Sequence, residues 1–233
     1  MKTHFALPLL AFILAFSFAS CSQNKLKDGE YKLEIYATND LHGRFFDSLY
    51  VSSQSQPVHP HSLASVSTMI KEARANSDNG QVVLLDIGDH LQGDNAVFYY
   101  NFIDTVSEHI FSKVMNYLNY DAVVVGNHDI EPGAKVYDKV VGELNMPYLA
   151  ANAINTETGE PYFAPYTILN KNGVKVAVIG LTNPNIPSWL SPELWEGIKF
   201  EEVVPTLEYW VAQVREKESP HFVIAAIHAG LGD

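Results

Sequence analysis

The fold follows from the segment Gln81–Asp94, which reads QVVLLDIGDHLQGD. Its first half is apolar on consecutive positions, which is typical of a strand covered on both faces. The run ends at a glycine followed by Asp89, so a carboxylate comes directly after the predicted strand. In open α/β sheets ligands gather beyond the carboxyl ends of the strands, and this segment therefore predicts both a buried strand and a functional group at its end.

Similar apolar runs recur along the chain and alternate with segments of helical period. Besides 81–87, the predicted strands are KLEIYAT at 32–38, DAVVVG at 121–126, VKVAVIGL at 174–181 and HFVIAAI at 221–227. The predicted helices cover residues 63–73, 105–118, 133–143 and 204–217. Residues 165–170 and 174–179, joined by KNG, are predicted to form a hairpin. This alternation predicts a layered α/β fold.

Polar side chains follow four of these strands at the point where each strand ends. They are Asp40 and His42 after the first, Asp89 after the second, Asn127 and His128 after the third, and His228 after the last. We expect them to converge in space, where carboxylate, amide and imidazole groups together suit a borderline divalent metal ion. An aspartate two residues before a histidine in extended chain sends both side chains to one face. Each signal alone also fits a helix N-cap or a hydrogen-bonded core histidine.

Glycines flank these candidate ligands. Gly43, Gly88, Gly93 and Gly126 stand where tight turns or positive φ angles are expected and where a larger side chain would block an ion. Two further polar residues have less direct interpretations. Asp86 is predicted to brace the neighbouring loop, and His90 is either a group behind the ligands or an ordinary loop histidine.

Composition limits the kinds of partner. The chain has 233 residues, 47% of them hydrophobic, and a formal net charge of -12. Proteins that bind nucleic acid through a basic face concentrate Lys and Arg, so we expect no nucleic-acid partner. A small anionic substrate remains compatible with an acidic chain if metal ions supply the positive charge locally.

The first residues predict export. Lys2 and an apolar run at 5–19 read as a signal peptide over 1–20, since the run is too short to span a bilayer as a helix. The sequence FASC resembles a bacterial lipobox, which implies lipidation of Cys21 and a tether over 21–30. The expected location is then the cell envelope outside the cytoplasm, in the periplasm or at the cell surface, with a lipid anchor in the membrane. The alternative is a soluble secreted protein with an incidental cysteine.

The polar motifs, taken together and in order, resemble a known family. D-x-H (Asp40, His42), GD (Asp89), GNHD (Asn127 to Asp129) and HAG (His228) are similar to the motifs of calcineurin-like metallophosphoesterases. The longer strings TNDLHGRF, GDHLQGD, GNHDIEPG and IGLTNPNIP resemble the 5'-nucleotidase and 2',3'-cyclic phosphodiesterase branch. The resemblance covers residues 31–233. It implies a β-sandwich with flanking helices whose C-terminal part, with a further ligand to each metal, is missing here.

The resemblance also implies the roles of the site residues. Two divalent metal ions (Mn, Zn, Fe or Co) would be bound by Asp40, His42, Asp89, Asn127 and His228, with Asp89 bridging them. His128 would contact the phosphate and protonate the leaving oxygen, oriented by Glu131 or by Asp129.

The implied reaction is hydrolysis of a nucleotide phosphate ester by a hydroxide that the two metals activate. The alternatives are a 2',3'-cyclic phosphodiesterase, a nucleotide-sugar hydrolase, or a truncated remnant that binds metal or ligand without catalysis.

Overall fold

The computed structural model describes residues 26–47, 62–77 and 80–230. The predictions for the signal peptide over 1–20 and for Cys21 lie outside these residues, so they stay predictions. In the described part of the chain, no helix has both the length and the apolar character needed to cross a membrane.

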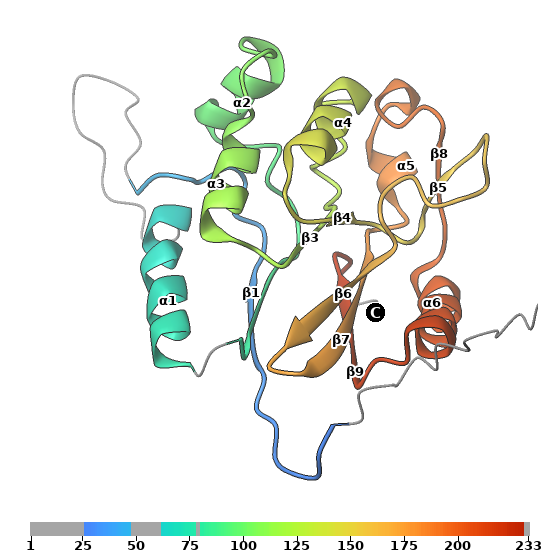
Figure 1. Cartoon of the computed structure of the whole chain (residues 1–233). Coiled ribbons are helices and arrows are strands. Elements are labelled where there is room, and N and C mark those ends of the chain that lie inside the picture. Colours follow the sequence, from blue (N-terminus) through green and yellow to red (C-terminus); the bar gives the residue numbers. More distant parts are fainter. Residues whose placement is uncertain (1–25, 48–61, 78–79, 231–233) are drawn as a thin grey trace, which may run out of the picture.

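Two facing sheets form the centre of the molecule (Figure 1). The first is fully parallel and has the order β1-β2-β3-β4, and the second has the order β6-β7-β9. In the second sheet β6 and β7 form the predicted antiparallel hairpin, while β9 runs parallel to β7. A small antiparallel pair, β5 and β8, lies to one side. The strands are β1 (Glu34–Thr38), β2 (Val82–Asp86), β3 (Ala122–Val124), β4 (Tyr148–Leu149), β5 (Ala153–Asn155), β6 (Tyr166–Lys171), β7 (Val174–Leu181), β8 (Ile198–Phe200) and β9 (Phe222–Ile227).

Helices cover the outer faces of both sheets (Figure 1). One core packs the first sheet against α1 to α4, and another packs β7 against α6. The helices are α1 (Leu63–Asn76), α2 (Asn95–Phe102), α3 (Ile110–Leu118), α4 (Ala134–Glu143), α5 (Ile186–Trp189) and α6 (Val203–Glu218), with a 3-10 turn at Pro192–Leu194. The predicted layered α/β fold, a β-sandwich with flanking helices, is confirmed.

Strand β2 explains the layering. All five of its residues are buried, as its continuous apolar run predicts. Val82 and Leu84 face the helices, whereas Val83 and Leu85 face the second sheet. Because side chains alternate along a strand, one short segment contributes to both cores and fixes the position of the loop that follows it.

The predicted helix over 105–118 begins later than expected, at Ile110. His109 is the N-cap of this helix and has an extended backbone, and its Nδ1 accepts a hydrogen bond from Phe111 N at 3.1 Å. Upstream, the Asp104 carboxylate accepts from Ser107 N and forms a separate turn. A side-chain cap at the helix start competes with a further helical turn, which is why the helix is shorter.

Candidate metal centre

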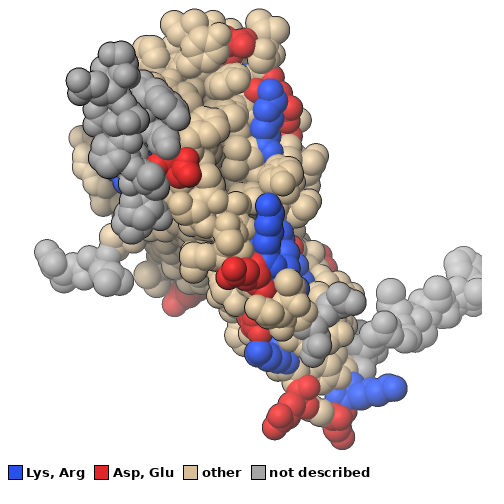
Figure 2. All heavy atoms as spheres, turned by 90° about the vertical axis from the view of Figure 1, so that its left-hand side faces the viewer, with Lys and Arg blue, Asp and Glu red and all other residues tan. Residues whose placement is uncertain are grey.

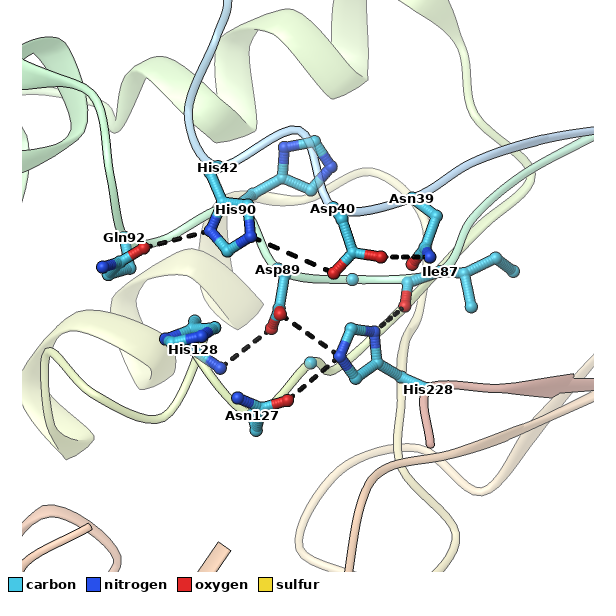
Figure 3. Close-up of polar contacts among 12 residues, drawn as sticks. Asn39, Asp40, His42, Ile87, Asp89, His90, Gln92, Asn127, His128 and His228 are labelled. Atoms are coloured by element: carbon cyan, nitrogen blue, oxygen red, sulfur yellow. Dashed lines mark hydrogen bonds and ion pairs between the residues drawn. The ribbon is translucent and has the colours of Figure 1, made fainter. Parts of the chain in front are cut away.

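Four strands direct their carboxyl ends to one place. The loops after β1, β2, β3 and β9 bring together all the predicted ligands, which Figure 3 shows around Asp89. Potential ligand atoms form two sets, and within each set the atoms lie within 4.8 Å of one another. One set comes from His42, Asp89 and His128, and the other comes from Asp40, Asp89 and His228. Asp89 belongs to both sets. The sets differ from the pairing implied by the resemblance, because His128 lies beside His42 and Asp40 lies beside His228.

Asp89 is the centre of the cluster and only 3% exposed. Its Oδ1 accepts a hydrogen bond from the backbone N–H of His128 at 2.8 Å, and its Oδ2 lies 3.3 Å from His228 Nε2. Burial raises the pKa of Asp89, but the hydrogen bond and charge of His228 outweigh burial and lower the pKa below its ordinary value. Asp89 is therefore held as an anion between the two sets.

His228 presents one ring nitrogen to the cluster. Its Nδ1 donates to the carbonyl oxygen of Ile87 at 2.6 Å, which leaves Nε2 to face Asn127 Oδ1 at 3.1 Å and Asp89 Oδ2. Burial lowers the pKa of His228, but the hydrogen bond and charge of Asp89 more than offset burial and raise the pKa to about 9. In the metal-free protein Nε2 thus carries a proton toward Asn127 Oδ1 and Asp89 Oδ2, and a divalent metal ion could take the place of that proton. A carboxylate, an amide oxygen and an imidazole whose other nitrogen is tied to a carbonyl fit a divalent metal ion.

His42 is oriented in the same way from the opposite side. Its Nδ1 lies 3.0 Å from Gln92 Oε1, so Nδ1 donates and Nε2 faces the cluster, 4.0 Å from Asp40 Oδ1. The ring of His42 contacts that of His128 edge to face, with 5.1 Å between ring centroids. Gln92 is thus a positioning group that the sequence reasoning did not single out, although it lies in the quoted string GDHLQGD.

The backbone of the D-x-H segment is not extended, and that prediction is wrong. Asp40 has a φ of 53° and His42 a φ of 47°, both in the left-handed region, as is Asp89 at 67°. Hydrogen bonds hold the segment, from Asp40 N to Gly88 O at 3.1 Å and from His42 N to Asp89 O at 2.8 Å. A left-handed residue costs about 1–2 kcal/mol. The surrounding loops therefore impose this geometry, and the two side chains share a direction because of a turn.

Gly126 is required by close approach rather than by its φ angle. A Cβ at this position would lie 2.1 Å from Asp89 Oδ1 and 2.4 Å from Asp89 N. Gly88 faces it across the same contact with a φ of 100°, and its Cβ would lie 2.6 Å from Gly126 N. The prediction that glycines flank the ligands for steric reasons is confirmed at both positions, and the expected positive φ is found at Gly43, Gly88 and Gly93 but not at Gly126.

Glu131 and Asp129 have different surroundings. Glu131 Oε1 accepts from His128 Nδ1 at 2.5 Å, and both side chains are about one-third exposed. Asp129 is fully buried, and its two oxygens accept four backbone hydrogen bonds. The donors are Asp89 N (2.9 Å), His90 N (2.7 Å), Leu91 N (2.8 Å) and Gly126 N (2.7 Å). Glu131 is the carboxylate that contacts His128, and Asp129 joins the loop of Asp89 to the loop of Asn127.

Asp86 braces the loop of Asp89, as predicted. It is fully buried and accepts from Gly88 N at 2.9 Å and from the Thr38 hydroxyl. Its Oδ2 also lies 2.7 Å from His90 Nε2. His90 is fully buried and stacks on Phe111, with 4.9 Å between ring centroids, so it is a group behind the ligands.

The chain is similar to known proteins in both sequence and fold. The family model described as calcineurin-like phosphoesterase matches residues 33–232. A 5'-nucleotidase of Vibrio cholerae serotype O1 is 34% identical over 228 residues, which are 95% of this chain and 38% of the relative. A 2',3'-cyclic-nucleotide 2'-phosphodiesterase/3'-nucleotidase of Yersinia enterocolitica is 28% identical over 241 residues, covering 99% of this chain and 35% of the relative. The chain thus spans well under half the length of these curated relatives.

Solved structures show the same fold. The calcineurin-like phosphoesterase YfkN from Bacillus subtilis matches with a TM-score of 0.75 and 28% identity, over 86% of this chain and 63% of that one. A putative 5'-nucleotidase from Staphylococcus aureus matches with a TM-score of 0.73 and 25% identity, over 84% of this chain and 37% of that one.

Proposed function

The chain belongs to the calcineurin-like phosphoesterase family, and from that premise we propose that it provides the metal centre of a hydrolase for phosphate esters of nucleotides. The observation that carries the proposal is the central position of Asp89, an anion whose carboxylate lies within 4.8 Å of ligand atoms of three other proposed ligands, Asp40, His42 and His228. Family members use divalent metals. A carboxylate in that central position suits a pair of neighbouring metal ions.

The chain's own residues would hold the ions and fix their surroundings. Asp40, His42, Asp89, Asn127 and His228 are the proposed ligands. When bound, the ions would neutralise charge on the phosphoryl oxygens and lower the pKa of water. The imidazoles are already oriented, because Gln92 accepts from His42 Nδ1 and the Ile87 carbonyl accepts from His228 Nδ1.

His128 is proposed to transfer a proton to the leaving oxygen. Its Nδ1 donates to Glu131, so its Nε2 is the nitrogen left for the substrate. The carboxylate of Glu131 stabilises the protonated ring and fixes its orientation, as a carboxylate does for a general-acid histidine. Asp129, which already receives four backbone hydrogen bonds, is not proposed to act on His128.

Nucleotides are the proposed substrates because of the activities for which the relatives are named. The first three relatives are 5'-nucleotidases, between 31% and 34% identical to this chain. The Yersinia relative, which matches 99% of the chain, is named for action on 2',3'-cyclic nucleotides, and this favours a cyclic diester as a second candidate substrate.

Phosphate release from purified protein tests the proposal. A nucleoside 5'-monophosphate and a 2',3'-cyclic nucleotide are each incubated with Mn²⁺ or Zn²⁺, and the wild type is compared with Asp89→Asn. Asp28→Asn, an exposed aspartate at the start of the described chain, is the matched control. We expect metal-dependent release by the wild type and by Asp28→Asn but not by Asp89→Asn. Release that is equal in all three proteins, or absent in all three with both metals, would count against the proposal.

The N-terminal anchor is a separate proposal that rests on the sequence FASC. Lipidation of Cys21 would place the protein in the cell envelope outside the cytoplasm. Expression with a labelled fatty acid tests this directly. Label should enter the wild type and not Cys21→Ser, and a wild type without label would leave the soluble secreted form.

A further inference from the structure

One fully buried carboxylate, that of Asp86, contacts two of the loops that carry proposed metal ligands. Asp86 is the last residue of β2, and its Oδ1 accepts from Gly88 N at 2.9 Å in the loop of Asp89. Its Oδ2 accepts from the hydroxyl of Thr38. Thr38 is the last residue of β1, directly before the loop of Asp40. The two oxygens of one side chain thus connect the ends of two neighbouring strands.

The direction of these hydrogen bonds follows from the protons that are available. Tyr120 Oη lies 2.9 Å from Thr38 Oγ1. A hydroxyl has one proton to donate, and Thr38 donates its own to the carboxylate of Asp86, which only accepts. Tyr120 therefore donates to Thr38, and burial raises the pKa of the Tyr120 phenol above its ordinary value, so this donor stays protonated. The chain of donors runs from Tyr120 through Thr38 to Asp86.

The loop of Asp40 depends on such contacts. β1 is the outer strand of its sheet, and within the described residues β2 is its only partner strand. Figure 2 shows the side of the molecule on which this edge lies, where acidic and basic side chains are interspersed. The Asp40 side chain is 50% exposed and its φ is 53°, so neither packing nor backbone preference fixes it. Its position rests on hydrogen bonds toward β2, from Asp40 N to Gly88 O at 3.1 Å and from Thr38 to Asp86.

We propose that Thr38 is a positioning residue of the metal centre. Its hydroxyl, through Asp86, fixes the spacing between the loop after β1 and the loop after β2. Asp40 and Asp89 stand in these loops and belong to one set of ligand atoms, so a shift of one loop against the other changes the fit of an ion. The inference rests on the proposed function, because that function is what makes the two aspartates metal ligands.

Metal titration of matched variants tests the inference. Thr38→Val keeps the shape of the side chain and removes the hydroxyl, whereas Thr38→Ser keeps the hydroxyl. Calorimetric titration with Mn²⁺ should give a dissociation constant that is about 10- to 100-fold weaker in Thr38→Val, as for other groups that orient metal ligands. Thr38→Ser should bind Mn²⁺ nearly as the wild type does. Thr167→Val, on β6 at the far edge of the other sheet, is the control and should also bind normally.

Amide hydrogen exchange in metal-free protein, resolved by NMR, gives a second measurement that needs neither metal nor substrate. In Thr38→Val the N–H groups of Gly88 and Asp40 should exchange about tenfold faster, as expected when one hydrogen bond that holds the loops is lost. The N–H of Ala151, which donates to Gly180 O at 2.7 Å away from β1, should exchange at the wild-type rate. An equal rise at Ala151 would show a general loss of stability and would overturn the inference.

The outcomes separate this inference from the proposed function. If the wild type binds Mn²⁺ but hydrolyses no ester, the proposed function fails and the titration still decides the role of Thr38. If Thr38→Val binds Mn²⁺ as the wild type does, or Thr38→Ser is equally impaired, the inference fails and the proposed function stands. A wild type that binds no metal overturns both. Should Thr38→Val not fold, Tyr120→Phe replaces it: binding should weaken by a smaller factor, and unchanged binding would overturn the inference.

Discussion

Replacement of Asp129 by asparagine should destabilise the loops that carry Asp89 and Asn127. In the wild type, Asp129 Oδ2 accepts from Asp89 N and Gly126 N, and Oδ1 accepts from His90 N and Leu91 N. An asparagine keeps one oxygen and turns an NH₂ group toward the other pair of N–H donors. Two hydrogen bonds to a charged acceptor are lost, and two buried N–H groups lose their partner.

The magnitude follows from the number of bonds lost. A hydrogen bond to a charged group contributes about 1.5–3 kcal/mol, so two of them amount to roughly 3–6 kcal/mol. That is a large fraction of the ~5–15 kcal/mol by which domains of this kind are stable. We therefore expect a decrease of this size in the free energy of unfolding, measured by urea denaturation of metal-free protein.

Asp94→Asn is the control for this prediction. Asp94 is the N-cap of α2 and accepts from Ala96 N at 3.0 Å, and asparagine caps a helix about as well as aspartate. Its unfolding free energy should stay close to the wild-type value. If Asp129→Asn were as stable as Asp94→Asn, the four backbone contacts would not support the loops and the reasoning would be refuted.

Three further predictions concern the site and its supports. Gly126→Ala should weaken metal binding at least tenfold by calorimetry, because the added Cβ would lie 2.1 Å from Asp89 Oδ1; Gly142→Ala, with no atom within 4 Å, should bind metal normally. Glu131→Ala should lower kcat roughly 10- to 100-fold with little change in KM, and a pure KM effect would contradict the proposed orientation of His128. Burial lowers the pKa of His109 from 6.5 to about 4, so the unfolded chain takes up the proton first and stability falls as pH drops from 6.5 toward 4. The loss approaches roughly 3 kcal/mol by urea unfolding, and His109→Asn should lack this part of the pH dependence.

The sequence predicted the ligands because parallel strands share one edge. Four apolar strands ending in polar residues bring Asp40, Asp89, Asn127 and His228 together: β1, β2 and β3 are parallel in one sheet, and β9 of the facing sheet ends at the same place. This inference needs only the direction of the strands and the position where each ends. It does not need the course of the backbone inside the loops, where the expected extended chain at Asp40 was wrong.

Helix α2 could not be predicted because its sequence has no polar face. The stretch NAVFYYNF is apolar or neutral all round, and only Val97 and Asn101 are buried. The amphipathic period from which α1 and α4 were predicted is therefore absent from α2. Strand β4 was not predicted for a different reason: its two residues are too few to show a periodic pattern.

The segment GNHDIE contains two carboxylates, and their burial, rather than their spacing along the sequence, determines which of them contacts His128. Asp129 and Glu131 both lie within three residues of His128, so the sequence left either as its partner. An ionised carboxylate has about four lone-pair sites, and the four N–H donors from the two loops occupy those of Asp129. It has no capacity left for an imidazole. Glu131, about one-third exposed, has its carboxylate free to meet His128 Nδ1 at 2.5 Å. The buried Asp129 thus binds the backbone of the two loops, and the accessible Glu131 binds the histidine. Only Glu131 can accept a hydrogen bond from the imidazole without losing hydrogen bonds that hold the loops together.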